Sequence, residues 1–314
     1  MQSLCSQTEI GLLNCQTLPH LNKRPVFMPG PSGPNQCLRD TVQTPCFNSG
    51  EGRTNENTAL TAIQALLLRQ HNLIAQKIKN LTNSSDLFQE TRRILIAQYQ
   101  HIIYNEYLPP VIGPTMMQKF RLLPQKNGTF FGYSLMTLPQ ITNEFTTAAF
   151  RYGHGMVPSQ MYKADENYTN IATFNLSDFS FAPHEAYVNG GLDAICRGTL
   201  ANPSLAPDSH FGDQLANHLF EVGVKQGSGF RFSLSAINIQ RGRDHGLLPY
   251  NQYRAQVGLN TAKKFSDFLT NMSPEQVNNL QNVYADVNDV DLYAGGMSEK
   301  ILEGAMVGQT FASK

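Results

Sequence analysis

The 314-residue sequence has little charge and no long apolar run, and both facts exclude classes of protein. Charged residues make up 15% of it, with 24 Lys and Arg against 24 Asp and Glu. Since no surplus of positive charge is available for phosphates, we exclude nucleic-acid binding as its main function. The longest apolar candidate ends at Arg69, so no transmembrane segment is predicted. The first residues have neither the basic nor the apolar region of a secretory signal.

Several common catalytic and metal-binding motifs are also missing. The sequence contains no G-x-G-x-x-G, P-loop, H-E-x-x-H or G-x-S-x-G pattern, which argues against the nucleotide-binding, zinc-protease and serine-hydrolase classes. No C-x-x-C spacing occurs, so a zinc site is not expected. The acidic run at residues 286–291 lacks the sixth-position glycine and terminal glutamate of an EF-hand loop, so we predict a solvated turn there.

Cysteines and glycosylation sequons favour the secretory route. Four of the five cysteines lie within the first 46 residues, in a segment with many prolines. Clustered cysteines suggest disulfides, although free thiols in a cytosolic protein would fit an odd count as well. Six N-x-Ser/Thr sequons also favour the secretory route. They begin at Asn80, Asn83, Asn127, Asn167, Asn175 and Asn271.

Hydrophobic periodicity predicts a mainly α fold. Residues 1–50 show no period, so we expect an irregular Cys- and Pro-rich segment of the same domain, followed by a helical part over residues 51–314. Residues 58–79 form the longest predicted helix, with Thr54 or Asn55 as its cap. Its expected buried stripe comprises Leu60, Ile63, Leu67, Ile74 and Ile78.

Four further helices are predicted. One spans residues 86–107, begins with a capping-box-like Asp86 and Gln89 pair, ends at Pro109-Pro110, and buries Leu87, Ile94, Leu95, Tyr99 and Ile102. A second spans residues 143–156, a third lies around residues 215–222, and a fourth begins at Ser273. Residues 129–133 would make at most a small hairpin. We therefore expect one large helical domain with few short strands.

Three segments combine residues that a plain hydrophobic core does not need. Arg53 and Glu56 project from the same side of a helix entrance, where they reach one ligand or form a surface ion pair. His154 has a glycine on each side, which would let a flat cofactor approach its ring as an axial iron ligand requires, unless the histidine is structural. Residues 238–247 hold arginines, Asp and His that suggest a polar network over a carboxylate or propionate, or else a solvated loop.

Taken together, these segments resemble the animal haem peroxidase family. Residues 52–56 followed by 66–72, Leu-Leu-Leu-Arg-Gln-His-Asn, are similar to the family's distal arginine, haem-linked glutamate and "LLLREHN" helix. Residues 104–109, 149–154 and 240–246 follow in family order. The resemblance extends more loosely over about residues 37–309. A plain helical protein without a cofactor is the remaining alternative.

The resemblance implies specific roles. His154 is the proximal iron ligand, and Asn238 accepts a hydrogen bond from its other ring nitrogen, which fixes the tautomer. Arg53 is the catalytic residue that stabilises the leaving oxygen of peroxide. Glu56 forms an ester to a haem methyl, so that haem b is held covalently.

The other implied positions are peripheral. Arg241 and Arg151 pair with haem propionates or polar groups at the haem edge. His71 looks catalytic but matches a structural position of its helix. Cys37 and Cys46 are the expected disulfide pair.

The implied reaction is oxidation of small donors, namely phenols, tyrosyl groups or halides, by hydrogen peroxide in an extracellular setting. The family's distal histidine, second haem-ester aspartate and calcium ligands precede the first residue of this chain, so we expect it to be part of a longer secreted protein, without calcium ligands of its own. A non-catalytic haem-binding or matrix-adhesion module that keeps only the proximal half of the fold is the alternative.

Overall fold

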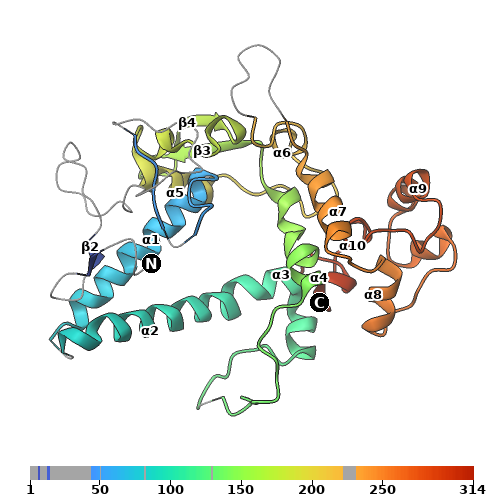
Figure 1. The fold of residues 1–314 in the computed structure, drawn as a ribbon, viewed down its shortest axis with the longest axis horizontal. Helices are drawn as coiled ribbons and strands as arrows, with labels where there is room; N and C mark the ends of the chain where they lie inside the picture. Colours follow the sequence, from blue (N-terminus) through green and yellow to red (C-terminus); the bar gives the residue numbers. More distant parts are fainter. Residues whose placement is uncertain are drawn as a thin grey trace. The chain divides into compact units, whose positions relative to one another are not determined.

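The computed structural model describes the backbone of residues 6–7 and 13–14, and residues 44–49, 51–80, 83–128, 130–221 and 231–314. In these ranges helices predominate, and the strands form two antiparallel pairs (Figure 1). The first pair joins β1 (Ser6–Gln7) to β2 (Leu13–Asn14). The expectation of a mainly α fold with few short strands is confirmed.

The chain divides into two compact units, each built from separate stretches of sequence. Unit 1 comprises Met1–Tyr99, Pro158–Ser204 and His218–Arg231, and unit 2 comprises Gln100–Val157, Leu205–Asn217 and Phe232–Lys314. Each unit therefore depends on contacts between residues far apart in the chain. The predicted boundary at residue 50 stays a prediction, since little of residues 1–50 is described.

In unit 1, the helix α5 (Gly191–Ala201) packs against the helix α1 (Thr58–Ile78) and against the hairpin of β3 (Gln160–Ala164) and β4 (Asn170–Asn175). Gly198 makes this packing possible, because a Cβ atom there would lie 1.8 Å from the carbonyl oxygen of Tyr162 on β3. The elements of this unit are α1 (Thr58–Ile78), most of α2 (Ser84–Ile102), β3 (Gln160–Ala164), β4 (Asn170–Asn175), the 3-10 turns η3 (Ser177–Phe179) and η4 (Pro183–Ala186), and α5 (Gly191–Ala201).

The α1 helix begins and packs differently from the prediction. Its cap is Asn57, whose Oδ1 accepts a hydrogen bond from the Leu60 amide at 3.0 Å, and not Thr54 or Asn55. Of the predicted stripe only Ile74 is buried, whereas Leu60 and Ile63 are exposed. The buried face instead consists mainly of small or polar side chains: Thr58, Thr61, Ala62, Ala65, Leu68, His71, Ile74 and Ala75. Small residues let α5 and η4 approach α1 closely, a requirement that hydrophobic periodicity does not reveal.

Pro109-Pro110 does not end the second helix, contrary to expectation. The helix α2 continues through a π-helical turn, η1 (Ile103–Tyr107), into α3 (Leu108–Lys119). Both prolines lie in the first turn of α3, and the π-helical turn before them shifts the backbone hydrogen bonds by one residue, as the bond from the Leu108 amide to the Ile103 oxygen shows. At the other end Asn83, and not Asp86, caps the helix, accepting a hydrogen bond from the Asp86 amide at 2.9 Å. Tyr99 and Ile102 of the predicted stripe are exposed.

The predicted helix over residues 143–156 is broken. It consists of α4 (Asn143–Thr147) and a 3-10 helix, η2 (Ala149–Met156), separated by Ala148 with a non-helical φ of −131°. The helix expected around residues 215–222 is the four-residue α6 (Asp213–Ala216), with residue 222 outside the described part. No strand forms at residues 130–133, and the larger hairpin is β3–β4, which the sequence analysis missed.

Unit 2 contains the larger of the two clusters of buried hydrophobic residues in the described part of the chain. Ser273 caps α9 as predicted, accepting a hydrogen bond from the Gln276 amide at 3.2 Å. Tyr250, Phe268, Met272 and Val290 are almost fully buried. The remaining elements of this unit are α7 (Leu234–Asp244), α8 (Tyr250–Gln256), the 3-10 helix η5 (Phe265–Thr270), α9 (Pro274–Val283), α10 (Leu292–Met297) and α11 (Gln309–Ala312).

A buried polar network ties α8 to the C-terminal part of unit 2. Glu299 and Arg254 form an ion pair at 2.6 Å, with side chains 1% and 6% exposed. The same carboxylate accepts hydrogen bonds from the Tyr250 hydroxyl at 2.5 Å and the Thr310 amide at 2.8 Å. Since its partners come from different segments, this network aligns α8, α11 and the loop that carries Glu299.

Buried tyrosines predict a loss of stability at alkaline pH. Burial raises the pKa of Tyr152, Tyr250, Tyr284 and Tyr293 above the ordinary value for tyrosine. Their contribution is complete below the unfolded pKa of about 10 and is lost as the pH rises above it, because only the unfolded chain then releases these protons. Each phenol should cost about 1.4 kcal/mol of unfolding free energy per pH unit there.

The measurement is urea unfolding at pH 8 and pH 10.5, with absorbance at 295 nm to report phenolate. We expect the buried phenols to ionise only as the protein unfolds. Tyr152→Phe is the matched control, since it keeps the side-chain volume. Its loss of unfolding free energy between pH 8 and pH 10.5 should be smaller than that of the wild type. Equal unfolding midpoints for wild type at the two pH values would contradict the prediction.

Candidate functional site

The 3-10 geometry of η2 places Arg151 and His154 on one face. A 3-10 helix has three residues per turn, so side chains three apart lie above one another. Ala149, Tyr152 and Gly155 form the buried face. Arg151 and His154 form the adjacent one, and both contact Asn238 of α7. An α-helix, as the sequence analysis assumed, would have turned the two side chains further apart.

Asn238 fixes the tautomer of His154. Its Oδ1 lies 3.2 Å from Nη1 of Arg151 and 3.1 Å from Nδ1 of His154, and the residue is fully buried. Because a guanidinium can only donate, the amide atom that faces Arg151 must be the acceptor Oδ1. The His154 nitrogen that shares this oxygen must then donate, so its proton is on Nδ1. The lone pair is left on Nε2, which makes no hydrogen bond with the described residues.

The surroundings of this histidine favour its neutral form. Burial lowers the pKa of His154 below the ordinary value, and the charge of Arg151 lowers it further. The Asn238 hydrogen bond acts in the opposite direction. A neutral imidazole with a free Nε2 is the form that binds a metal ion.

Arg151 and Arg241 bring two positive charges close together. Burial and then repulsion from Arg241 lower the pKa of the Arg151 guanidinium. The exposed Arg241 side chain makes no hydrogen bond or ion pair with any residue that the structure describes. A shared anion would offset the repulsion between the two guanidinium groups. This side of His154 is therefore suited to binding carboxylates.

The two glycines beside His154 have different roles. A Cβ atom on Gly155 would lie 2.8 Å from the carbonyl oxygen of His210, so this glycine allows close packing of two backbones. A Cβ on Gly153 would meet no atom within 4 Å. We expected both glycines to let a flat cofactor approach the His154 ring, but only Gly153 borders open space.

The polar segment at residues 238–247 is mostly helical, and its side chains have separate partners. Arg243 makes two hydrogen bonds to Asp291, at 3.0 Å and 2.7 Å. Asp244 accepts one from Gln240 at 2.8 Å, and Nδ1 of His245 lies 2.8 Å from Oδ1 of Asn143. Arg243, Asp244 and His245 therefore do not form one network with each other, and most of the segment is helix rather than the loop given as the alternative. Asp291, placed by the sequence analysis in a solvated turn, is half-buried and anchors Arg243.

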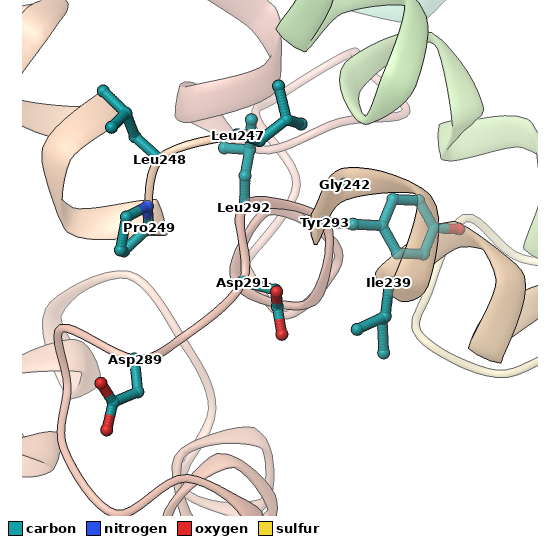
Figure 2. Close-up of a pocket in the computed structure, with 9 residues that line it drawn as sticks. All are labelled: Ile239, Gly242, Leu247, Leu248, Pro249, Asp289, Asp291, Leu292 and Tyr293. Atoms are coloured by element: carbon teal, nitrogen blue, oxygen red, sulfur yellow. The ribbon is translucent and has the colours of Figure 1, made fainter. Parts of the chain in front are cut away.

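A small cavity lies beside α7 in unit 2 (Figure 2). Its volume is about 50 Å³, room for a water-sized group and far below the several hundred cubic ångströms of typical ligand pockets. This cavity therefore cannot hold a flat macrocycle. Its lining comprises Ile239, Gly242, Leu247, Leu248, Pro249, Asp289, Asp291, Leu292 and Tyr293.

Arg53 and Glu56 belong to unit 1, in the turns that precede α1. Arg53 donates through Nε to Glu51 at 3.0 Å, and not to Glu56 as the ion-pair interpretation proposed. Its two Nη atoms make no hydrogen bond or ion pair with the residues that the structure describes. Burial raises the pKa of Glu56, although the positive charge of Arg53 opposes this. Each side chain is thus available to a further group.

His71 lies in the core of unit 1. It is 4% exposed and tilts against the Phe88 ring, with centroids 5.5 Å apart. Burial lowers its pKa. These contacts agree with the structural role expected for it.

Tyr107 and Tyr293 make hydrogen bonds to η2 that were not predicted from the sequence. The Tyr293 hydroxyl donates to the Arg151 carbonyl oxygen at 3.3 Å, and the hydroxyls of Tyr107 and Tyr152 lie 3.1 Å apart. Tyr107 ends the π-helical turn within the Tyr104–Pro109 motif, whose presence was the only sequence signal. Nothing local to Tyr293 indicates its position beside η2.

Several expectations fall outside or at the edge of the described residues. Cys37 lies outside them, and the disulfide with the buried Cys46 stays a prediction. Cys196 of α5 is a free thiol. In the described part of the chain, no helix is long and apolar enough to cross a membrane, and no group of three His, Cys, Asp or Glu residues could hold a metal ion.

The chain is similar to known haem peroxidases. The family model described as animal haem peroxidase matches residues 1–313. Heme peroxidase 2 of Caenorhabditis elegans is 37% identical over 270 residues, which make up 84% of this chain and 37% of the relative. Chorion peroxidase of Drosophila melanogaster is 38% identical over 279 residues, or 88% of this chain and 34% of the relative.

Solved structures show the same fold. Peroxidase A from Dictyostelium discoideum matches with a TM-score of 0.79 at 33% identity, covering 99% of this chain and 57% of that one. A rice fatty acid alpha-dioxygenase matches with a TM-score of 0.68 at 18% identity, which shows a shared fold alone. This chain spans about a third of the length of the two curated relatives.

Proposed function

This chain belongs to the animal haem peroxidase family, and from that premise we propose that it acts as a haem-dependent peroxidase, with hydrogen peroxide as oxidant and a small phenol, tyrosyl group or halide as reductant. The observation that carries the proposal is the Asn238 oxygen shared by Arg151 and His154, because it leaves Nε2 of a neutral histidine free for iron.

The residues present fit a haem group. His154 offers a single nitrogen ligand with its tautomer fixed, and Gly153 leaves space beside the ring. Arg151 and Arg241 supply positive charge for the two propionates. When bound, haem would supply the iron that reacts with peroxide and accepts electrons from the reductant.

On this proposal, His154 would hold the iron through Nε2. Its Nδ1–H donates to Asn238, and this hydrogen bond orients the ring and increases electron donation from the imidazole. Arg151 holds the Asn238 amide in the required orientation, because its Nη1 donates to the same Oδ1 that accepts from His154. It therefore acts as a positioning residue as well as a propionate partner.

We assign the peroxide-facing role to Arg53. Its free Nη atoms would donate hydrogen bonds to the oxygen that leaves as the O–O bond breaks, while Glu51 fixes the guanidinium through Nε. We assign to Glu56 the ester that would make haem attachment covalent. Secretion forms part of the proposal and is supported by the clustered cysteines and the sequons.

Peroxide-dependent oxidation of guaiacol by the haem-reconstituted chain tests the function. We expect turnover above that of free haem. Arg53→Gln should lower kcat/KM for peroxide roughly 100- to 1,000-fold and leave the haem spectrum unchanged, as loss of one preorganised donor does. Arg93→Gln, the same substitution at an arginine of α2 with its side chain 80% exposed, is the matched control and should retain wild-type activity.

A specific haem complex that oxidises guaiacol no faster than free haem would contradict the peroxidase proposal. That result would favour the alternative, a non-catalytic haem-binding module.

A further inference from the structure

The sequons of this chain differ in what their asparagine amides do in the folded protein. Glycosylation needs a free amide nitrogen and room for a sugar beside it. Three sequons, at Asn167, Asn175 and Asn271, lie wholly within the described residues with their side chains placed. They divide into one open sequon and two closed ones.

Asn167 lies at the tip of the β3–β4 hairpin, with its side chain exposed. The turn is held by Asp165, whose Oδ1 accepts hydrogen bonds from the amides of Asn167 and Thr169, each at 2.9 Å. The Asn167 side chain takes no part in the turn and makes no hydrogen bond with described residues. The middle residue, Tyr168, is 54% exposed, and Thr169 is exposed too.

Asn271 is in the opposite situation. Its Nδ2 donates to the Tyr250 hydroxyl at 2.8 Å and to Oε1 of Glu299 at 3.3 Å, so both amide hydrogens have acceptors in the buried network. The middle residue, Met272, is fully buried and pairs with Glu299 in a β-bridge. Ser273, the hydroxyl residue of the sequon, caps α9.

Asn175 resembles Asn271 more than Asn167. Its Nδ2 donates to Oδ2 of Asp178 at 3.0 Å. The two residues that follow, Leu176 and Ser177, are 7% and 8% exposed. The sequon is therefore folded into the end of β4 and the start of η3.

We propose that Asn167 carries N-linked carbohydrate and that Asn175 and Asn271 are unmodified in the folded protein, their amide nitrogens being structural donors. The transfer takes an oligosaccharide from a lipid-linked pyrophosphate. The bond between the sugar C1 and the pyrophosphate oxygen breaks, Nδ2 forms the new bond to C1, one amide proton is released and the lipid pyrophosphate leaves.

The transfer would disrupt the network at Asn271. Only one hydrogen would remain on Nδ2 for two acceptors, and the sugar would need the space that Tyr250 and Glu299 occupy. A chain modified there could not close the buried network, so it would be absent from the folded population. At Asn167 the same reaction removes no contact.

Site occupancy in the secreted protein tests this directly. The chain is expressed behind a secretory leader in eukaryotic cells, and the folded, protease-resistant fraction is treated with peptide N-glycosidase in H₂¹⁸O. Mass spectrometry then reports heavy-oxygen aspartate wherever a glycan was attached. We expect the label at Asn167 in most molecules and at Asn175 and Asn271 in almost none.

Thr169→Ala, which keeps Asn167 but removes the acceptor hydroxyl, should abolish the label at that site. Label at Asn271 or Asn175 in the folded fraction, or its absence from Asn167, would overturn the proposal.

A stability comparison on unglycosylated protein tests separately whether the Asn271 amide is a structural donor. In protein made in bacteria, Asn271→Asp removes both donors and places a carboxylate beside Glu299, so Tm should fall by roughly 5 to 10 °C. Asn167→Asp is the matched control and should leave Tm unchanged within about 1 °C. Equal Tm values for the two variants would overturn the assignment of Asn271 as a structural amide. Both tests are independent of peroxidase activity.

Discussion

The His154→Ala variant is expected to lose iron-ligated haem. In the wild-type chain, Nε2 of this histidine is free because Nδ1 donates to Asn238. Removing an outer partner of a metal ligand already costs about 10- to 100-fold in affinity, so removing the ligand itself should cost more than about 100-fold. Titration of the chain with ferric haem, followed by its Soret absorption, measures the difference.

Two variants make the interpretation of this titration specific. Asn238→Leu keeps the ligand but removes the shared acceptor, so haem affinity should fall by an intermediate amount of about 10- to 100-fold. His101→Ala alters an exposed histidine of α2 and should bind haem as the wild type does. If His154→Ala bound haem with wild-type affinity and spectrum, another residue would be the ligand, and the proximal assignment would be wrong.

Glu299→Leu is expected to lower the unfolding free energy by about 3 to 5 kcal/mol, the largest stability effect we anticipate. The variant leaves the Arg254 guanidinium buried without its carboxylate partner, and an uncompensated buried charge costs this much. The Tyr250 hydroxyl and the Thr310 amide lose their acceptor as well. Urea unfolding monitored by far-ultraviolet circular dichroism measures the change.

An exposed ion pair supplies the control for this variant. Arg53 and Glu51 are also bonded, at 3.0 Å, but their side chains are 69% and 43% exposed. Because solvent screens such a pair, Glu51→Gln should change the unfolding free energy by less than about 1 kcal/mol. The double variant Arg254→Met/Glu299→Leu should recover part of the loss, since it removes both charges. Equal effects of Glu299→Leu and Glu51→Gln would refute the role given to the network.

Local signals in the sequence predicted where a helix begins better than they predicted which side of a helix is buried. Ser273-Pro274 marked the start of α9 correctly, because capping depends on a few consecutive residues. The buried face of α1 was mostly wrong, because alanines and threonines there allow close contact with α5. Pro109-Pro110 failed as a stop signal, because the π-helical turn η1 let a new helix begin at the prolines.

Sequence motifs identified the candidate residues and implied the hydrogen bond between His154 and Asn238, and the structure added the contact of Arg151. Resemblance singled out Arg151 and His154 in one segment and Asn238 in another. The structure shows that one buried oxygen joins all three. It also separates Arg243, which the residue pattern suggested as part of a network over an anion, because Asp291 already holds it.

The sequence by itself determined the family and the helical class and singled out the candidate site residues, because motifs and helix caps are written in short runs of neighbouring residues. The tertiary structure alone decided that Arg151 shares the Asn238 oxygen with His154 and that Glu299 is buried. It also decided that Asn271 donates to the core while Asn167 faces solvent. Each of these depends on partners distant in the chain, whose positions are set by packing and by the pairing of buried polar groups.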